Sequence, residues 1–159
     1  MAVSQLPVGA VLLVVLVSVV SGPLVPWVDL TRAPPAPGAG TASASVESVP
    51  SEVRLVRERF GAGRYRLDAP AAVVGVDAVR GRPVLRYVVD VPALSFVATS
   101  ERPLAGRDGD RVTLAVGGAT ASPRQVDRES YEATVAVWLR EGPEYTALVQ
   151  REVTVEVVG

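Results

Sequence analysis

The sequence contains no cysteine and no histidine, and all 16 of its basic residues are arginine. Without cysteine, the chain can form no disulfide and supports no thiolate chemistry. Without histidine, it lacks the commonest general base and transition-metal ligand, so Ser95, Ser100 and Ser122 cannot belong to a conventional catalytic triad. The absence of lysine excludes Schiff-base catalysis. These absences favour a non-catalytic protein that carries no cofactor and no metal.

Asparagine and isoleucine are also absent, and with lysine they are the residues whose codons are rich in A and T. We therefore interpret the composition as that of a GC-rich genome. The net charge of −1 predicts no electrostatic affinity for nucleic acid. Aromatic residues make up only 5% of the chain, so any core must consist of Val, Leu and Ala.

The first 28 residues contain no charged side chain. A transmembrane helix needs roughly 20 apolar residues to cross a bilayer. The run therefore predicts an N-terminal transmembrane anchor in residues 1–30, with Trp27 at the membrane interface just before Asp29. The residues expected to contact lipid are Leu6, Val8, Leu12, Leu13, Leu16 and Val20, together with Trp27.

A cleaved signal peptide and a buried soluble helix are the alternatives for this run. The apolar stretch from Val8 to Val20 fits the hydrophobic region of a signal peptide. Against cleavage, no basic residue precedes the stretch, and Pro23 follows the small residues Ser21 and Gly22. Charge determines the orientation poorly, because Arg32 is the first basic residue. By analogy with other anchored β-domains, we expect a single-pass protein in the cell membrane with an extracytoplasmic C-terminal domain.

Residues 31–50 are rich in Pro, Ala, Gly and Ser, which is typical of a flexible tether. We expect this linker to be followed by one domain over residues 51–159. Residues 51–60 fit either a strand or a helical turn. Residues 64–68, 72–80, 84–91, 94–100 and 111–116 read as strands. Gly81-Arg82-Pro83 predicts a turn that joins the second and third of these in a hairpin.

The strongest alternation is near the C-terminus. Tyr131, Ala133, Val135, Val137 and Leu139 alternate with more polar positions, and Val153, Val155 and Val157 do so after the turn at residues 141–144. Because Arg151 falls on the Val face, we expect a bulge or the end of burial near Gln150.

Seven or eight short strands and no convincing helix predict an all-β fold, an antiparallel immunoglobulin-like (Ig-like) β-sandwich. The run from Asp127 to Tyr131 supports this topology, because a tyrosine four residues after an aspartate precedes the penultimate strand of such domains and ties the loop back. We therefore expect a tyrosine corner at Asp127 and Tyr131, although a lone tyrosine at a strand start is the alternative. The cysteine pair of antibody domains is missing.

The anchor, linker and sandwich, together with residues 63–70 (GRYRLDAP) and 84–92 (VLRYVVDVP), resemble uncharacterised cell-surface proteins of halophilic archaea. The layout is also similar to that of archaellum and pilus accessory proteins. The net charge departs from the acidic habit of halophiles, and actinobacterial proteins share the composition. This resemblance implies an archaeal surface protein and no catalytic residues.

Two short motifs could carry chemistry. Asp108 and Asp110 could share a cation, but Gly109 between them favours a turn. Gly61-Ala62-Gly63 lacks the third glycine of a dinucleotide-binding loop, and Arg66 stands in its place. Arg57, Arg59, Arg64 and Arg66 are interleaved with other residues, which favours a solvated strand face over an anion site.

We expect a non-catalytic, membrane-anchored domain with a structural or protein-binding role in the cell envelope or a surface appendage. Its partners would be the lipid bilayer, through the N-terminal helix, and another envelope or filament protein, through the sandwich. One alternative is a pilin-like or filament accessory subunit that assembles through its N-terminal helix, although no basic residue precedes that helix. A small-ligand-binding or carboxylate-based enzyme domain is the other alternative.

Overall fold

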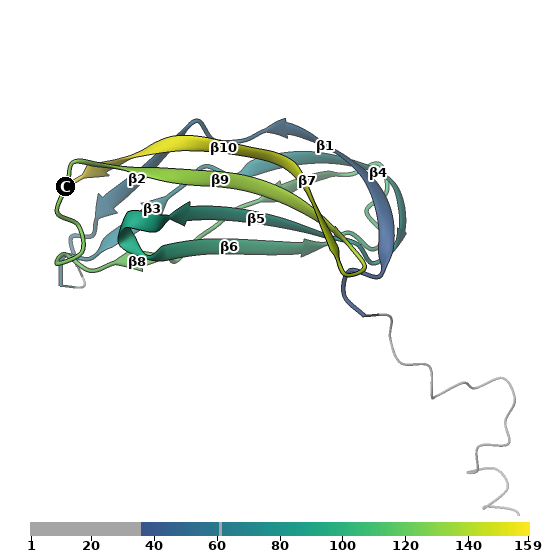
Figure 1. Cartoon of the computed structure of the whole chain (residues 1–159), viewed down its shortest axis with the longest axis horizontal. Coiled ribbons are helices and arrows are strands. Elements are labelled where there is room, and N and C mark those ends of the chain that lie inside the picture. Colours follow the sequence, from purple (N-terminus) through teal and green to yellow (C-terminus); the bar gives the residue numbers. More distant parts are fainter. Residues whose placement is uncertain (1–35, 61) are drawn as a thin grey trace, which may run out of the picture. The chain divides into compact units, whose positions relative to one another are not determined.

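A computed structural model describes residues 36–60 and 62–159 of the chain (Figure 1). These residues form β-strands and one short 3-10 helix, η1 (Pro92–Leu94). The strands are β1 (Gly40–Ser48), β2 (Glu52–Arg57), β3 (Tyr65–Asp68), β4 (Ala72–Gly81), β5 (Val84–Val91), β6 (Phe96–Pro103), β7 (Arg111–Leu114), β8 (Thr120–Ala121), β9 (Ser130–Glu141) and β10 (Glu144–Val158). The predicted all-β class is confirmed.

The strands form two sheets that share one apolar core. The small sheet has the order β1-β4-β7, and the large sheet has the order β6-β5-β9-β10-β2-β3-β8. Every pair is antiparallel except β10 with β2, in which Thr154–Val158 run parallel to Glu52–Val56. The prediction of a wholly antiparallel sandwich is therefore wrong for this pair. A parallel pair needs a long connection between its two strands, and β3 to β9 lie between β2 and β10 along the chain.

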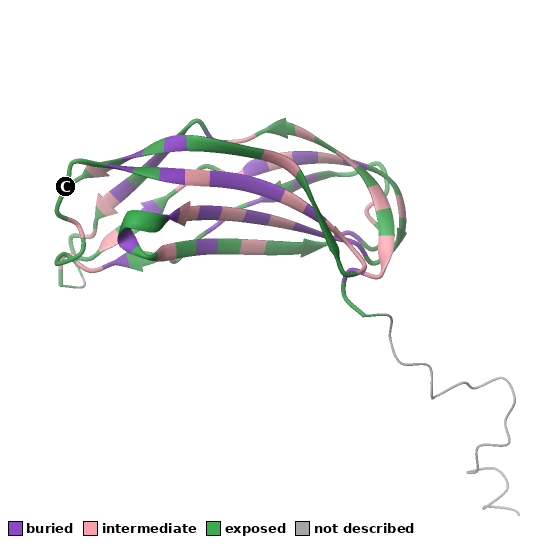
Figure 2. Cartoon of the chain, in the orientation of Figure 1, coloured by how far each residue is buried: buried purple, intermediate pink, exposed green. Residues whose placement is uncertain are grey.

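The core is made almost entirely of aliphatic side chains, as the low aromatic content predicts. Buried residues alternate with exposed ones along the strands (Figure 2). Tyr87 on β5 is the largest fully buried side chain, and its neighbours in the core are mostly Val and Leu. Each fully buried Val or Leu contributes roughly 1.5–3 kcal/mol. The alternation of apolar and polar residues in the sequence therefore places one apolar face of each sheet against the other.

The predicted C-terminal hairpin is confirmed as β9 and β10, paired from Glu141 and Glu144 at the turn to Ser130 and Glu156. The five positions predicted to face the core from β9, from Tyr131 to Leu139, are all buried. The register shifts between Ala147 and Val149, so the bulge lies slightly before the predicted place. Arg151 is exposed, and burial on β10 resumes at Val153.

The predicted linker is wrong over its second half, because residues 40–48 form strand β1. In β1, small apolar residues at Ala42, Ala44 and Val46 alternate with exposed Thr and Ser, and these three pack against the core. The low-complexity composition therefore conceals a period of two. The boundary of the β-domain lies before residue 40 rather than at 51, and the segment at 52–57, left open by its sequence, is a strand.

The predicted hairpin between residues 72–80 and 84–91 is also wrong. β4 pairs with β1 and β7, whereas β5 pairs with β6 and β9 in the other sheet. The intervening turn is held by the segment before β1: Arg82 N donates to the carbonyl of Ala39 at 2.7 Å, and Gly38 N donates to the carbonyl of Arg82 at 2.9 Å. The turn therefore carries the chain from one sheet to the other.

The residues predicted to form the membrane anchor, from Leu6 to Trp27, lie outside the described residues. Within residues 36–60 and 62–159, no helix has the length and apolar character needed to span a membrane.

Candidate functional site

The candidate site is a cluster of aromatic and arginine side chains on the outer face of the large sheet. Trp138 on β9 lies opposite Arg86 of β5 on one side and Ala147 of β10 on the other. With Val88 and Tyr145, Trp138 and Arg86 line a shallow hollow of about 310 Å³. We call these four residues, together with Arg140 at the edge, the Trp138 face.

The register of three adjacent strands brings these side chains together. Arg86 and Val88 are two residues apart on β5 and so point to the same side of the sheet. Trp138 and Arg140 are likewise two residues apart on β9, and Tyr145 is the register partner of Arg140. Their side chains are half-buried or exposed, unlike the intervening residues, which face the core. Two aromatic side chains and a valine therefore lie, with two arginines, on the face that an amphipathic strand normally gives to polar residues.

Two guanidinium groups lie within cation–π distance of the Tyr145 ring. The Cζ atom of Arg140 is 5.5 Å from the ring centroid, and that of Arg86 is 5.9 Å from it. Contacts within about 6 Å of the centroid are attractive because the ring face carries negative charge. Arg140 is also held by its Nε, which donates to the carbonyl of Gly142 at 3.1 Å. Tyr145 is therefore oriented by cations from two different strands.

Arg86 is only partly satisfied by its surroundings. Its Nε lies 3.7 Å from the Oε1 of Glu101, which is an ion-pair distance and too long for a hydrogen bond. This Nε is buried, and within the described part of the chain it has no hydrogen-bond partner. The side chain as a whole remains 38% exposed, so its outer N–H groups can reach a ligand. A guanidinium beside Trp and Val suits a carboxylate that is attached to an apolar group.

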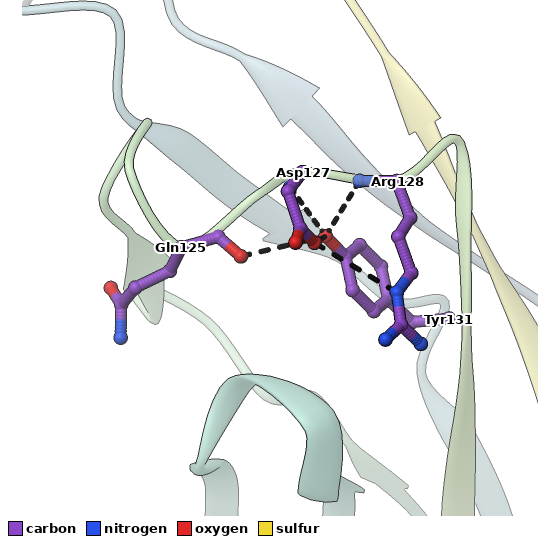
Figure 3. Close-up of polar contacts among 4 residues, drawn as sticks. All are labelled: Gln125, Asp127, Arg128 and Tyr131. Atoms are coloured by element: carbon purple, nitrogen blue, oxygen red, sulfur yellow. Dashed lines mark hydrogen bonds and ion pairs between the residues drawn. The ribbon is translucent and has the colours of Figure 1, made fainter.

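The structure brings the sequence-predicted pair Asp127 and Tyr131 together (Figure 3). Tyr131 stands at the start of β9 and is 4% exposed. Its hydroxyl accepts hydrogen bonds from the backbone N–H groups of Asp127 at 2.7 Å and Arg128 at 3.0 Å. It lies 3.0 Å from Asp127 Oδ1 and 3.5 Å from the carbonyl of Gln125, its two acceptors. The hydroxyl therefore fastens the loop before β9 to the core.

The two carboxylates of residues 108–110 serve the turn and do not converge on a common point. Asp108 Oδ1 accepts a hydrogen bond from the backbone N–H of Val79 at 3.0 Å. Asp110 pairs with Arg107 at 3.8 Å. Among residues 36–60 and 62–159, no three acidic side chains are grouped so that they could hold a metal ion. The turn interpretation of this motif therefore matches the contacts that its side chains make.

The arginines of the β2–β3 region lie at the surface. Arg66 is 4.0 Å from Glu58, and both side chains are partly exposed. Arg57 lines an open hollow of about 590 Å³ with Arg59 and Gly159. Gly61 lies outside the described residues, so the glycine motif at 61–63 has no described geometry as a whole.

Sequence reasoning did not single out the Trp138 face, although one signal for it was present. In the alternating pattern of β9, Trp138 occupies a position expected to face solvent, as do Glu132, Thr134 and Arg140. A tryptophan at an outward position of an otherwise amphipathic strand indicates a contact surface. Arg86 and Tyr145 carry no such signal, because only the pairing of β5, β9 and β10 brings them to Trp138.

No protein-family model matches the sequence, and no curated protein is similar to it. The geometry of the chain's own residues is therefore the basis for a functional conclusion.

Proposed function

We propose that this chain is a non-catalytic, membrane-anchored Ig-like domain that binds another protein outside the cytoplasm through the Trp138 face. The Trp138 face is the observation that carries the proposal. Trp, Tyr and Arg are the residues most enriched among those that dominate binding energy at protein interfaces. An open, shallow surface that unites all three suits a protein partner better than an enclosed small-molecule site.

The topology supports the Ig-like part of the proposal. In the proposed Ig-like topology, β1, β4 and β7 would correspond to strands A, B and E, and β6, β5, β9 and β10 to C′, C, F and G; the strand order of the two sheets supports this. Tyr131 then occupies the start of strand F, which is the place of the conserved tyrosine corner. The Trp138 face lies on the sheet that contains C, C′, F and G.

The exposed part of the Arg86 guanidinium supports a partner of definite chemistry. Arg86 and Arg140 present cations beside the Tyr145 ring, and Glu101 is the acidic group that pairs with Arg86. A carboxylate from a partner would gain hydrogen bonds of the strong, charge-assisted kind. We therefore expect an acidic side chain next to an apolar one on the partner surface. The uncharged run at residues 1–28 supports the membrane anchor, and the β-rich body supports the extracytoplasmic location by analogy.

The proposal is tested by photo-crosslinking in intact cells. A photoreactive residue at position 138 should give one discrete cross-linked protein. The matched control is the same residue at position 60, because Phe60 is another aromatic side chain, 88% exposed, outside the Trp138 face. Arg86→Glu should weaken binding of the identified partner by about thirtyfold or more, which corresponds to loss of a binding hot spot of about 2 kcal/mol.

Two results would contradict the proposal. Equal cross-linking from positions 138 and 60 would show that the Trp138 face is not the binding surface. Protease added to intact cells should remove the domain, and a domain that stays membrane-bound yet fully protected would show that the proposed orientation is wrong.

A further inference from the structure

Strand β6 is a free edge of the large sheet. It forms one margin of the large sheet and pairs with β5 over all eight of its residues. The other margin, β8, has two residues, and β7 in the small sheet has four. The remaining edge strand, β1, is partly capped, because Ala42 N donates to the Glu141 carboxylate at 2.9 Å. β6 is therefore longer than the edges β7 and β8, whereas the nine-residue edge β1 is capped at Ala42.

The register shows which backbone groups of β6 are open. Leu104 N donates to the carbonyl of Pro83 at 2.9 Å, so residues 104 and 83 are a hydrogen-bonded pair. In an antiparallel ladder such pairs alternate, so residues 102, 100, 98 and 96 also bond to β5. The backbone groups of Val97, Thr99 and Glu101 then point away from the sheet. Their side chains lie on the outer face, in register with Asp90, Val88 and Arg86 respectively.

We propose that β6 pairs with the β6 of a second copy of this chain, antiparallel about a two-fold axis at Thr99. In this register Thr99 faces Thr99 of the second copy, and Val97 faces Glu101. Val97, Thr99 and Glu101 of each strand then find partners, giving about six hydrogen bonds, two for each pair. The two large sheets become one continuous sheet.

Features of β6 select this register and this partner. Displacing the centre toward the C-terminus by one residue places Pro103, which has no N–H, opposite Val97. Displacing it by two residues places Glu101 opposite Glu101, which is repulsive. With the centre at Thr99, Pro103 falls opposite Ser95, whose left-handed backbone (φ 50°) already ends the strand. Of the three registers compared, the one centred on Thr99 therefore avoids both conflicts.

Side chains on the outer face support the same pairing. Facing threonines are a favourable cross-strand pair. Val97 is 58% exposed in the single chain, and the hydrocarbon stem of the facing Glu101 would cover it. The row Val88–Thr99 of one copy would continue directly into Thr99–Val88 of the other. Because the axis is perpendicular to the sheet, the two Trp138 faces would lie on the same side, a bivalent arrangement that raises avidity.

The test uses the full chain in mild detergent and measures its mass by sedimentation. We expect the wild-type chain to dimerise, and Thr99→Pro to weaken the dimer by about a hundredfold, because the N–H groups of both Thr99 copies are lost from the centre of the ladder. The Thr99 N–H takes no part in the ladder with β5, so the fold should tolerate the change. Thr113→Pro is the matched control. Because Val76 N donates to the carbonyl of Asp110, residues 76 and 110 are a hydrogen-bonded pair of β4 and β7, and by alternation Thr113 points its N–H away from β4. The Thr113→Pro chain, which is changed at β7 and not at β6, should therefore still dimerise.

A second pair of variants removes any dependence on the proline. Because the chain has no cysteine, Thr99→Cys introduces a single thiol. Facing residues of a hydrogen-bonded pair have Cα atoms about 5.5 Å apart, within the range that a disulfide spans. Mild oxidation should therefore convert Thr99→Cys, and not Thr113→Cys, to a covalent dimer. A wild-type chain that stays monomeric at about 1 mM, a dimer unaffected by Thr99→Pro, or equal cross-linking of both cysteine variants would overturn the proposal. None of these outcomes depends on the Trp138 face.

Discussion

Replacing Tyr131 by phenylalanine removes one hydroxyl group and leaves the aromatic ring in place. The ring is 4% exposed and should stay packed between the sheets. The lost oxygen is the acceptor for the backbone N–H groups of Asp127 and Arg128. Its own proton can serve one acceptor at a time, and Asp127 Oδ1 at 3.0 Å is nearer than the carbonyl of Gln125 at 3.5 Å. The substitution therefore removes three hydrogen bonds at once.

The expected loss of stability follows from that count. A hydrogen bond contributes about 0.5–1.5 kcal/mol net, so three contribute about 1.5–4.5 kcal/mol. Asp127 and Arg128 are exposed, which allows water to reach their freed N–H groups and lowers the upper part of this range. We expect the free energy of unfolding to fall by about 1.5–3 kcal/mol. The loop before β9 should also exchange its amide protons faster, because its tie to the core is gone.

Urea unfolding of the full chain, followed by far-ultraviolet circular dichroism, measures the effect. The matched control is Tyr145→Phe, since Tyr145 is 43% exposed and no hydrogen bond of its hydroxyl is present within the described residues. The control should change stability by less than about 0.5 kcal/mol. If Tyr131→Phe were as stable as Tyr145→Phe, the hydroxyl would not hold the loop, and the role assigned to it would be wrong.

Two further substitutions test the core and the turn between the sheets. Burial raises the pKa of Tyr87 to about 12 from 10.0, so the folded state favours the neutral phenol. The free energy of unfolding should therefore be constant below about pH 10. It should fall by up to about 3 kcal/mol as the pH rises to about 12. Urea unfolding midpoints between about pH 10 and about pH 12 should fall less for Tyr87→Phe than for the wild-type chain. An identical fall in the two proteins would show that Tyr87 is not the group that titrates. Gly81 and Gly106 share a φ of 73°, but only at Gly81 would a Cβ collide, 2.5 Å from the carbonyl oxygen of Ala39. Gly81→Ala should therefore cost clearly more than the roughly 1 kcal/mol of strain expected for Gly106→Ala, and equal unfolding free energies would refute the close packing.

The sequence predicts the parts of the fold whose signal is local. The β9–β10 hairpin is correct because β9 alternates along its length and β10 alternates from Val153 to Val157, with a Gly-Pro turn between the two strands. Asp127 and Tyr131 were paired by a spacing of four residues within one loop, and they do meet. In each case the information lies within a few residues of the structure it determines.

The parts that the sequence predicts poorly are those whose partners are far along the chain. The Trp138 face joins β5 to β9 and β10, so Arg86 lies more than 50 residues from Trp138. The choice between a hairpin and a crossing after β4 is likewise settled by β1, which competes for the edge of β4. A turn motif such as Gly81-Arg82-Pro83 indicates that the chain changes direction there. It does not indicate which strand the following strand will pair with.

The glycines and alanines of the predicted linker have a packing role where they enter the domain. A Cβ on Gly40 would overlap the carbonyl oxygen of Arg80, and Gly38 accepts a hydrogen bond from Gly142 N at the tip of the terminal hairpin. Small residues are therefore required there by close approach of three backbone segments, and flexibility is not their purpose.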